Sequence, residues 1–204
     1  FFLGLLFLGS IYYNLILTTI LLILFVEILF ETNFILNKIL KNKYKLRHYI
    51  FLIIILFYLL FLIINIWLIK VNNYFDEQLV LLLIISTCIS TDVGGYFFGN
   101  IFKGKKLIKI SPNKTYSGMY GSFILSLILN YILFNDYLGL EKLLIFSLLI
   151  SFISQFGDLL ISYIKRKAKI KDAGNIFPGH GGCLDRFDGL VFAIPFGLML
   201  FNFL

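Results

Sequence analysis

Apolar residues occupy most of this chain in long runs, which short polar segments interrupt. A transmembrane helix needs about 20 consecutive, mostly apolar residues. No internal repeat is apparent, and the polar segments are too short to form a core of their own. The pattern therefore predicts an all-α, polytopic membrane protein whose residues 1–204 form a single transmembrane domain. Five or six runs qualify as spans, giving about six transmembrane helices at 11–30, 49–69, 78–99, 117–135, 142–163 and 187–204.

The composition supports this fold class. Of the 204 residues, 60% are hydrophobic and only 14% are charged, whereas about a quarter of a typical soluble domain is charged. A net charge of +7 would favour nucleic acid as the partner of a soluble protein. In a membrane protein it is typical of cytoplasmic loops and of contact with anionic headgroups. We therefore expect membrane lipids and no nucleic acid as partners. Because the chain starts at Phe1, we expect its N-terminal part to be incomplete.

Basic residues are concentrated in alternate loops. The segments 31–48, 100–116 and 164–186 contain all but two of the 18 Lys and Arg residues, whereas 70–77 and 136–141 are nearly neutral or acidic. Antiparallel spans require such an alternation, and the positive-inside rule places basic loops in the cytoplasm. We therefore expect a multi-pass protein of the bacterial inner (plasma) membrane, with its active site facing the cytoplasm.

The first basic loop has a second feature. Ile35, Leu36, Ile39 and Leu40 recur at helical spacing, with Asn and Lys residues between them. This pattern is typical of a short helix lying in the membrane interface. A Lys-rich connector without regular structure is the alternative, and both interpretations remain open on the sequence alone.

Three aspartates lie at or near the last basic loop. Asp158 stands inside an apolar run, where a charge is expensive and therefore a candidate for function, and Gly157 beside it allows close backbone approach. Asp185 and Asp188 are three residues apart, which places them on one face of a helix beginning there, at the end where the helix dipole favours anions. Asp158, Asp185 and Asp188 therefore predict a Mg²⁺ site, since Mg²⁺ takes oxygen ligands and shares them with substrate phosphates. The structural alternatives are a Lys partner for Asp158 and an N-cap role for Asp185.

The polar segment 162–188 also supplies cations, glycines and His180. In Pro178-Gly-His-Gly-Gly182 the glycines leave room for a ligand to approach the backbone, and His180 could donate to a phosphate or act as an acid or base. A second polar patch, 92–121, lies on the same predicted membrane face. There, Ser111 and Lys114 precede the fourth span, Ser or Thr residues are helix caps, and Lys114 is close to a helix N-terminus suited to anions.

The polar segment has the pattern SxxKRxxxxKDxGxxxPGHGGxxDRxD from Ser162 to Asp188. It resembles the signature of the phosphatidate cytidylyltransferase (CDP-diacylglycerol synthase) family, and all of the fixed positions match. DVGGYFFGNIF, from Asp92, is similar to the family's DxGAYFxGRxFG, and SPNKT, from Ser111, is similar to SPKKT. The resemblance covers about residues 86–204, which we expect to be the catalytic region, and Glu27 is a further candidate match. One departure is Ser117, where the family usually has Glu.

The resemblance implies a metal-dependent nucleotidyltransferase of phospholipid biosynthesis. CTP and phosphatidate would give CDP-diacylglycerol and pyrophosphate, with Mg²⁺ as cofactor. A second, monovalent cation such as K⁺ and a homodimer are left open. Asp158, Asp185, Asp188 and His180 are the predicted catalytic residues, with Asp92 and Asp172 as secondary candidates. The predicted substrate-binding residues are Ser111, Lys114, Lys165, Arg166, Lys171 and Arg186.

Two other functions fit parts of the pattern. A transporter or channel would also place Asp residues in membrane spans, but it predicts polar residues deep in several spans rather than at one face. A CTP-dependent transferase acting on another membrane lipid, such as an isoprenoid phosphate or alcohol, would share the same chemistry. The sequence does not separate these lipids, because acceptor choice depends on the groove between spans.

Overall fold

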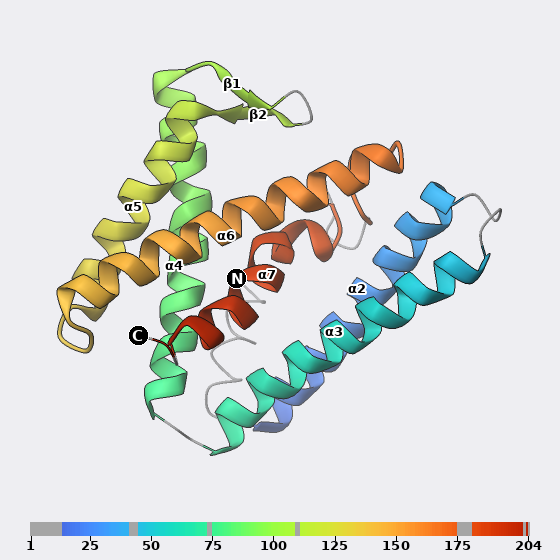
Figure 1. The fold of residues 1–204 in the computed structure, drawn as a ribbon, viewed down its shortest axis with the longest axis horizontal. Coiled ribbons are helices and arrows are strands. Elements are labelled where there is room, and N and C mark those ends of the chain that lie inside the picture. Colours follow the sequence, from blue (N-terminus) through green and yellow to red (C-terminus); the bar gives the residue numbers. More distant parts are fainter. Residues whose placement is uncertain are drawn as a thin grey trace. The chain divides into compact units, whose positions relative to one another are not determined.

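The computed structural model describes residues 14–40, 45–72, 75–108, 111–174, 181–201 and 203. Helices make up nearly all of this part of the chain, and a two-stranded hairpin connects two of them (Figure 1). The elements, in chain order, are α2 (Asn14–Leu40), α3 (Lys45–Asn72), α4 (Phe75–Phe102), β1 (Lys106–Ile108), β2 (Ser111–Thr115), α5 (Tyr116–Phe134), α6 (Leu140–Lys167) and α7 (Leu184–Phe201).

Within the described residues, five helices are long and apolar enough to cross a membrane: α2, α3, α4, α5 and α6. The predicted class, an all-α polytopic membrane protein, is therefore confirmed. The sixth predicted span, 187–204, corresponds to α7. This helix has 18 residues, of which Asp185, Arg186 and Asp188 are charged, so it is not among the five.

Two predicted loops have regular structure instead. Residues 31–40 continue α2 without a break. The helical interpretation of residues 35–40 is therefore confirmed, although the residues end a long helix instead of forming a short one, and the irregular connector is wrong for this stretch. No Gly or Pro interrupts the segment, and Ile35 is buried, which explains why the helix continues. The predicted loop 100–116 contains the β1–β2 hairpin, in which Lys106 pairs with Thr115 and Ile108 with Ser111.

The described chain divides into two compact units. The first unit comprises residues 1–78 and 167–186, and the second comprises 79–166 and 187–204. In the first unit, α2 and α3 run side by side in opposite directions (Figure 1). Its buried apolar residues lie on both helices and include Ile28, Ile35, Leu59, Leu62 and Ile69. The prediction of a single transmembrane domain with a catalytic region at 86–204 stays a prediction.

The core of the second unit contains a hydrogen-bonded polar cluster as well as apolar side chains. Asn130 of α5 is completely buried; its amide donates to the hydroxyls of Thr87 (2.7 Å) and Ser147 (2.9 Å), and its carbonyl accepts from Ser86 (2.7 Å). A buried amide is costly in an apolar medium unless its hydrogen bonds are made. Here the bonds are made between three helices, so the cluster ties α4, α5 and α6 together.

Glycines allow the helices of the second unit to approach closely. A Cβ on Gly94 of α4 would lie 2.7 Å from the carbonyl oxygen of Gly121 in α5, and one on Gly118 would lie 2.7 Å from that of Gly95. Small residues at facing positions are typical of tightly packed membrane helices. This contact holds the start of α5, and the hairpin before it, against the end of α4.

Candidate active site

The first part of the candidate site is at the start of α5. The hydroxyl of Thr115 caps this helix by accepting from the backbone N–H of Gly118 at 3.1 Å, so the prediction of a Ser or Thr cap is confirmed. Lys114, the residue before the cap, forms an ion pair with Asp158 of α6. Ser162, one turn further along α6, donates to the other Asp158 oxygen at 3.3 Å. The predicted alternative of a Lys partner for Asp158 is thus met, and the partner is itself a predicted substrate-binding residue.

The second part of the site is the contact of α6 with α7. A Cβ on Gly157 would lie 2.7 Å from Cδ2 of Phe192 and 2.9 Å from the carbonyl oxygen of Asp188. The sequence-based prediction that Gly157 permits close backbone approach is therefore confirmed. The contact brings the turn of α6 that carries Asp158 against the turn of α7 that carries Asp188.

Asp188 lies in a concentrated field of charges. One of its oxygens accepts from the backbone N–H of Gly189 at 2.8 Å. The carboxylates of Asp158 and Asp92 repel its charge, and the ammonium of Lys165, a buried side chain, attracts it. With Lys114, the second unit therefore contains two lysines and three carboxylates whose charges act on one another. The lysines of such a set can bind a phosphate.

The third predicted carboxylate, Asp185, has a different environment in the first unit. Its Oδ2 accepts from the backbone N–H groups of Ala173 (2.8 Å) and Gly182 (2.9 Å). Both donors precede α7, so Asp185 does not act as a plain N-cap, which would accept from N–H groups later in its own helix. Asp185 thereby holds residues 173 and 182 of the polar segment close together. Gly181 beside it has φ +82°, a backbone conformation that glycine adopts without strain.

Sequence analysis missed Glu31, which has the strongest contacts to the polar segment in the first unit. This α2 residue is only 5% exposed, and its two oxygens accept from the backbone N–H groups of Cys183 (2.8 Å) and Leu184 (2.7 Å). A Cβ on Gly174 would lie 2.5 Å from Glu31 Oε1, so the segment closes tightly around the carboxylate. The signal in the sequence was a carboxylate inside an apolar run, but the residue had been assigned to a loop.

The remaining predicted site residues lie as follows. Arg166, Lys171, Asp172 and Arg186 are exposed, and Ser111 is half-buried in β2. His180 lies outside the described residues. Ser117, which stands where the family usually has Glu, faces the hairpin: its hydroxyl is 3.0 Å from that of Thr115 and accepts from the backbone N–H of Gly104 at 3.4 Å.

In the part of the chain that the structure describes, no three Asp, Glu, His or Cys side chains form a group that could hold a metal ion. Asp185 belongs to the first unit, and Asp158 and Asp188 belong to the second. The predicted metal ligands therefore stay a prediction.

Apolar helices long enough to span a membrane define the class of this protein: it is an integral membrane protein, and its second unit carries a cluster of charged side chains. A family comparison makes this specific. The model of the cytidylyltransferase family matches residues 1–204, so the chain belongs to this enzyme family.

Several bacterial relatives carry the name phosphatidate cytidylyltransferase. The chain is 46% identical to the one from Staphylococcus saprophyticus over 109 residues, which cover 52% of this chain and 42% of that protein. It is 43% identical to the one from Bacillus subtilis over 128 residues (59% and 47%). The identity to the Rickettsia prowazekii protein is 42% over 130 residues (59% and 57%). The chain thus spans about half the length of these curated relatives.

Proposed function

We propose that this chain carries the catalytic region of a phosphatidate cytidylyltransferase, which converts CTP and phosphatidate to CDP-diacylglycerol and pyrophosphate. The observation that carries the proposal is the charged cluster of the second unit, where Lys114 pairs with Asp158 and Lys165 attracts the neighbouring Asp188. The family match and the names of the relatives support this reaction over other uses of such a cluster.

The chemistry needs positioning more than acid–base groups. An oxygen of the phosphatidate phosphate attacks the α-phosphorus of CTP and forms the new P–O bond. The bond from the α-phosphorus to the oxygen that bridges to the β-phosphorus breaks, and pyrophosphate leaves with that electron pair. The attacking phosphate is already anionic, so no proton has to be removed from it. Catalysis then rests on holding the two anions in line and on neutralising their charge.

Lysines of the cluster suit that task. Lys114 is paired with Asp158 in the described structure, and both side chains keep about a quarter of their surface exposed (29% and 26%). An incoming phosphate can therefore replace Asp158 as the partner of the Lys114 ammonium. The Asp158 carboxylate is then able to bind a cation. Lys165, which is buried beside Asp188, would supply a second positive charge. Arg166, Lys171, Arg186, Ser111 and His180 remain proposed substrate contacts.

The donor set of the cluster fits Mg²⁺, a hard cation that prefers carboxylate oxygens and fills its remaining positions with water and phosphate. Asp158 and Asp188 would hold the ion, while Asp185, which the sequence also predicted as a ligand, belongs to the other unit and is proposed to position the polar segment. When bound, Mg²⁺ supplies positive charge to the phosphates. The residues of the chain orient both substrates.

Glu31 and Asp185 would act on the reaction indirectly. Their carboxylates accept hydrogen bonds from backbone N–H groups at residues 173 and 182–184. These residues lie within the segment that has the family pattern. We assign both residues a positioning role. Glu31 extends the proposed catalytic machinery to a helix outside residues 86–204.

The proposed location is the cytoplasmic face of the bacterial inner membrane. CTP arrives from water and phosphatidate from the leaflet, and a site at helix ends gives access to both. The basic residues after α4 and at the end of α6 support this orientation through the positive-inside rule. Reporter fusions to the segments 72–75 and 136–139 are expected to lie on the opposite face from a fusion within 103–106.

The decisive experiment is a transferase assay of the purified protein in mixed micelles. Labelled CTP and Mg²⁺ are supplied with phosphatidate, with an isoprenoid phosphate or with an isoprenoid alcohol. Among the three acceptors, we expect only phosphatidate to give a labelled product, and that product is CDP-diacylglycerol. If folded protein used only an isoprenoid acceptor, the phosphatidate assignment would be wrong and the cytidylyltransferase class would stand.

A further inference from the structure

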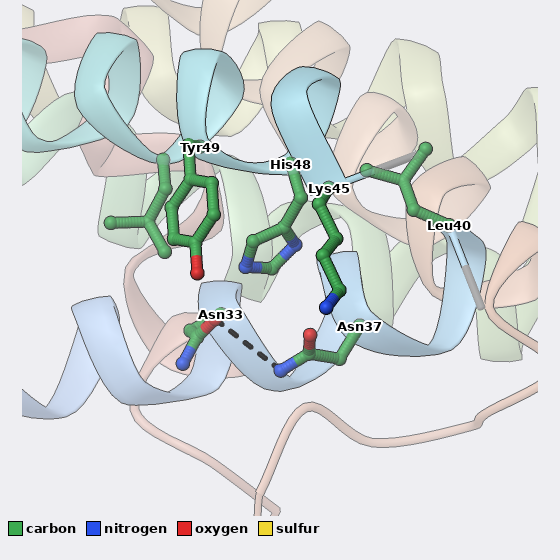
Figure 2. Close-up of a pocket in the computed structure, with 7 residues that line it drawn as sticks. Asn33, Asn37, Leu40, Lys45, His48 and Tyr49 are labelled. Carbon is green, nitrogen blue, oxygen red and sulfur yellow. Dashed lines mark hydrogen bonds between the residues drawn. The ribbon is translucent and has the colours of Figure 1, made fainter. Parts of the chain in front are cut away.

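A polar pocket lies between α2 and α3 in the first unit. Its volume is about 310 Å³, which is at the lower end of the range for small-ligand sites. Figure 2 shows polar side chains of both helices turned toward one another across it. The polar lining residues are Asn33 and Asn37 of α2 and Lys45, His48 and Tyr49 of α3.

The lining is rich in hydrogen-bond donors and lacks carboxylates. Lys45 supplies an ammonium, and the two Asn side chains supply amides that already bond to each other at 3.4 Å. Nδ1 of His48 is buried and has no hydrogen-bond partner among the described residues. A buried polar atom without a partner is destabilising, so a ligand that forms a hydrogen bond with this atom would bind more tightly.

The electrostatic field at the pocket is positive. Lys45 is the first residue of α3, so the N-terminal N–H groups and positive dipole end of that helix are at the pocket. The C-terminal end of α2 contributes an opposite partial charge, but Lys38 and Arg47 lie close in sequence to the lining. The chain has no acidic residue between Glu31 and Asp76, and the Glu31 carboxylate accepts from Cys183 and Leu184 instead.

Apolar surface adjoins the polar lining. Leu40 and Leu52 complete the pocket wall, and Leu46, Ile50 and Ile53 on the neighbouring turns of α3 are largely exposed. Both helices are long and apolar enough to span a membrane, so their exposed apolar side chains face lipid. A ligand with an anionic head and apolar tails matches this division better than a wholly polar anion does.

We propose that the α2–α3 pocket binds the phosphate of an anionic phospholipid headgroup. The Lys45 ammonium, the Asn37 amide and the His48 imidazole donate to the phosphate oxygens, and the acyl chains lie along the apolar surface of the two helices. This site goes beyond the proposed reaction, because none of its residues belongs to the segment that resembles the catalytic region.

Native mass spectrometry of the purified chain with phosphatidylglycerol tests the proposal. No CTP is present, and this lipid is not a substrate of the proposed reaction, so the outcome is independent of catalysis. We expect phosphatidylglycerol to bind to the wild type, with at least a fivefold loss of affinity in Lys45→Gln and in His48→Phe. Diacylglycerol, which lacks the phosphate, is expected to bind weakly and equally to all variants.

Lys38→Gln is the matched control. It removes the same charge from the same pair of helices, but Lys38 lies over the Phe34 ring, 4.4 Å from its centroid, and does not line the pocket. We expect less than a twofold change there. Equal losses in Lys38→Gln and Lys45→Gln would show nonspecific attraction and overturn the proposal, as would unchanged binding in the pocket variants.

Two further arms complete the test. Inorganic phosphate at millimolar concentration is expected not to displace the lipid, and displacement would identify a site for soluble phosphate instead. Circular dichroism of each variant checks the fold. If His48→Phe loses helix content, Asn37→Leu replaces it and is held to the same fivefold criterion.

Discussion

Carboxylates in the two units of this protein have different kinds of partner. In the first unit, Glu31 and Asp185 accept from backbone N–H groups of the polar segment. In the second unit, Asp158 meets the ammonium of Lys114, and Asp188 accepts from the backbone N–H of its neighbour Gly189 but also lies among the charges of other side chains. Glu31 is buried, whereas about a quarter of the Asp158 side chain is exposed.

This difference separates two functions of the same chemical group. A backbone donor cannot leave its acceptor unless the chain moves. A carboxylate with backbone donors therefore stabilises a local conformation. A lysine has a long, flexible side chain, and it can exchange its partner for a phosphate without a change of fold. The type of donor and the exposure together therefore predict which carboxylates stabilise the structure and which meet substrate.

The largest expected effect is on catalysis by the second unit. Asp158→Asn and Asp188→Asn keep the volume of each side chain and remove its charge. We expect each to lower kcat for CDP-diacylglycerol formation by about 100-fold or more, since charge at the reacting phosphates contributes most of such a rate, with little change in thermal stability. Asp136→Asn, at an exposed turn, is the matched control and should keep full activity.

Loss of a Glu31 contact is expected to act on stability first. In Glu31→Gln one acceptor oxygen is replaced by an NH₂ group, which then faces a backbone N–H. A hydrogen bond to a charged group contributes about 1.5–3 kcal/mol, so we expect a loss of about 2–3 kcal/mol, seen as a lower melting temperature in detergent.

Glu27→Gln makes the same change one turn earlier on α2, and it should lower the melting temperature far less. Activity of Glu31→Gln should fall with the population of the ordered segment, and Mg²⁺ dependence should be unchanged. Comparable destabilisation by Asp158→Asn and Glu31→Gln would break the distinction between the two units.

The helix contact at Gly157 is expected to have a smaller effect on both properties. In Gly157→Ala the new methyl group meets Phe192 and the backbone of Asp188, so α7 has to shift. Overpacking of this kind costs about 1–3 kcal/mol, and we expect about a tenfold loss of kcat with KM for CTP less affected. Gly139→Ala is the control, because a Cβ there meets nothing within 4 Å. An equal effect of both substitutions would contradict a specific α6–α7 contact.

The sequence predicted the class of fold because length and apolarity alone define a membrane span. It also predicted a Ser or Thr cap before the fourth span and a close contact at Gly157, since both follow from rules that act over one or two helical turns. It could not predict the contact of Glu31 with residues 183–184, because more than 150 positions separate them along the chain and no local pattern encodes such a pairing. The extent of α2 was missed for a related reason: its charges were taken to mark a loop, although the helix continues through them.

Cys183 gives the smallest and most local test of the comparison. The thiol is 2% exposed, and burial, together with the nearby Glu31 charge, raises its pKa to about 12. Thiols are alkylated as thiolates, and with this pKa the thiolate is only about one part in ten thousand at pH 8.

In a Cys88→Ser background, which leaves Cys183 as the sole cysteine, we therefore expect very slow maleimide labelling of the folded protein and fast labelling in SDS. Glu31→Gln removes one repelling charge and loosens the backbone at Cys183, so it should accelerate labelling by about tenfold. Asp158→Asn should leave the labelling rate unchanged, because Asp158 belongs to the other unit. Acceleration by both substitutions would mean that the two sets of carboxylates stabilise a common structure.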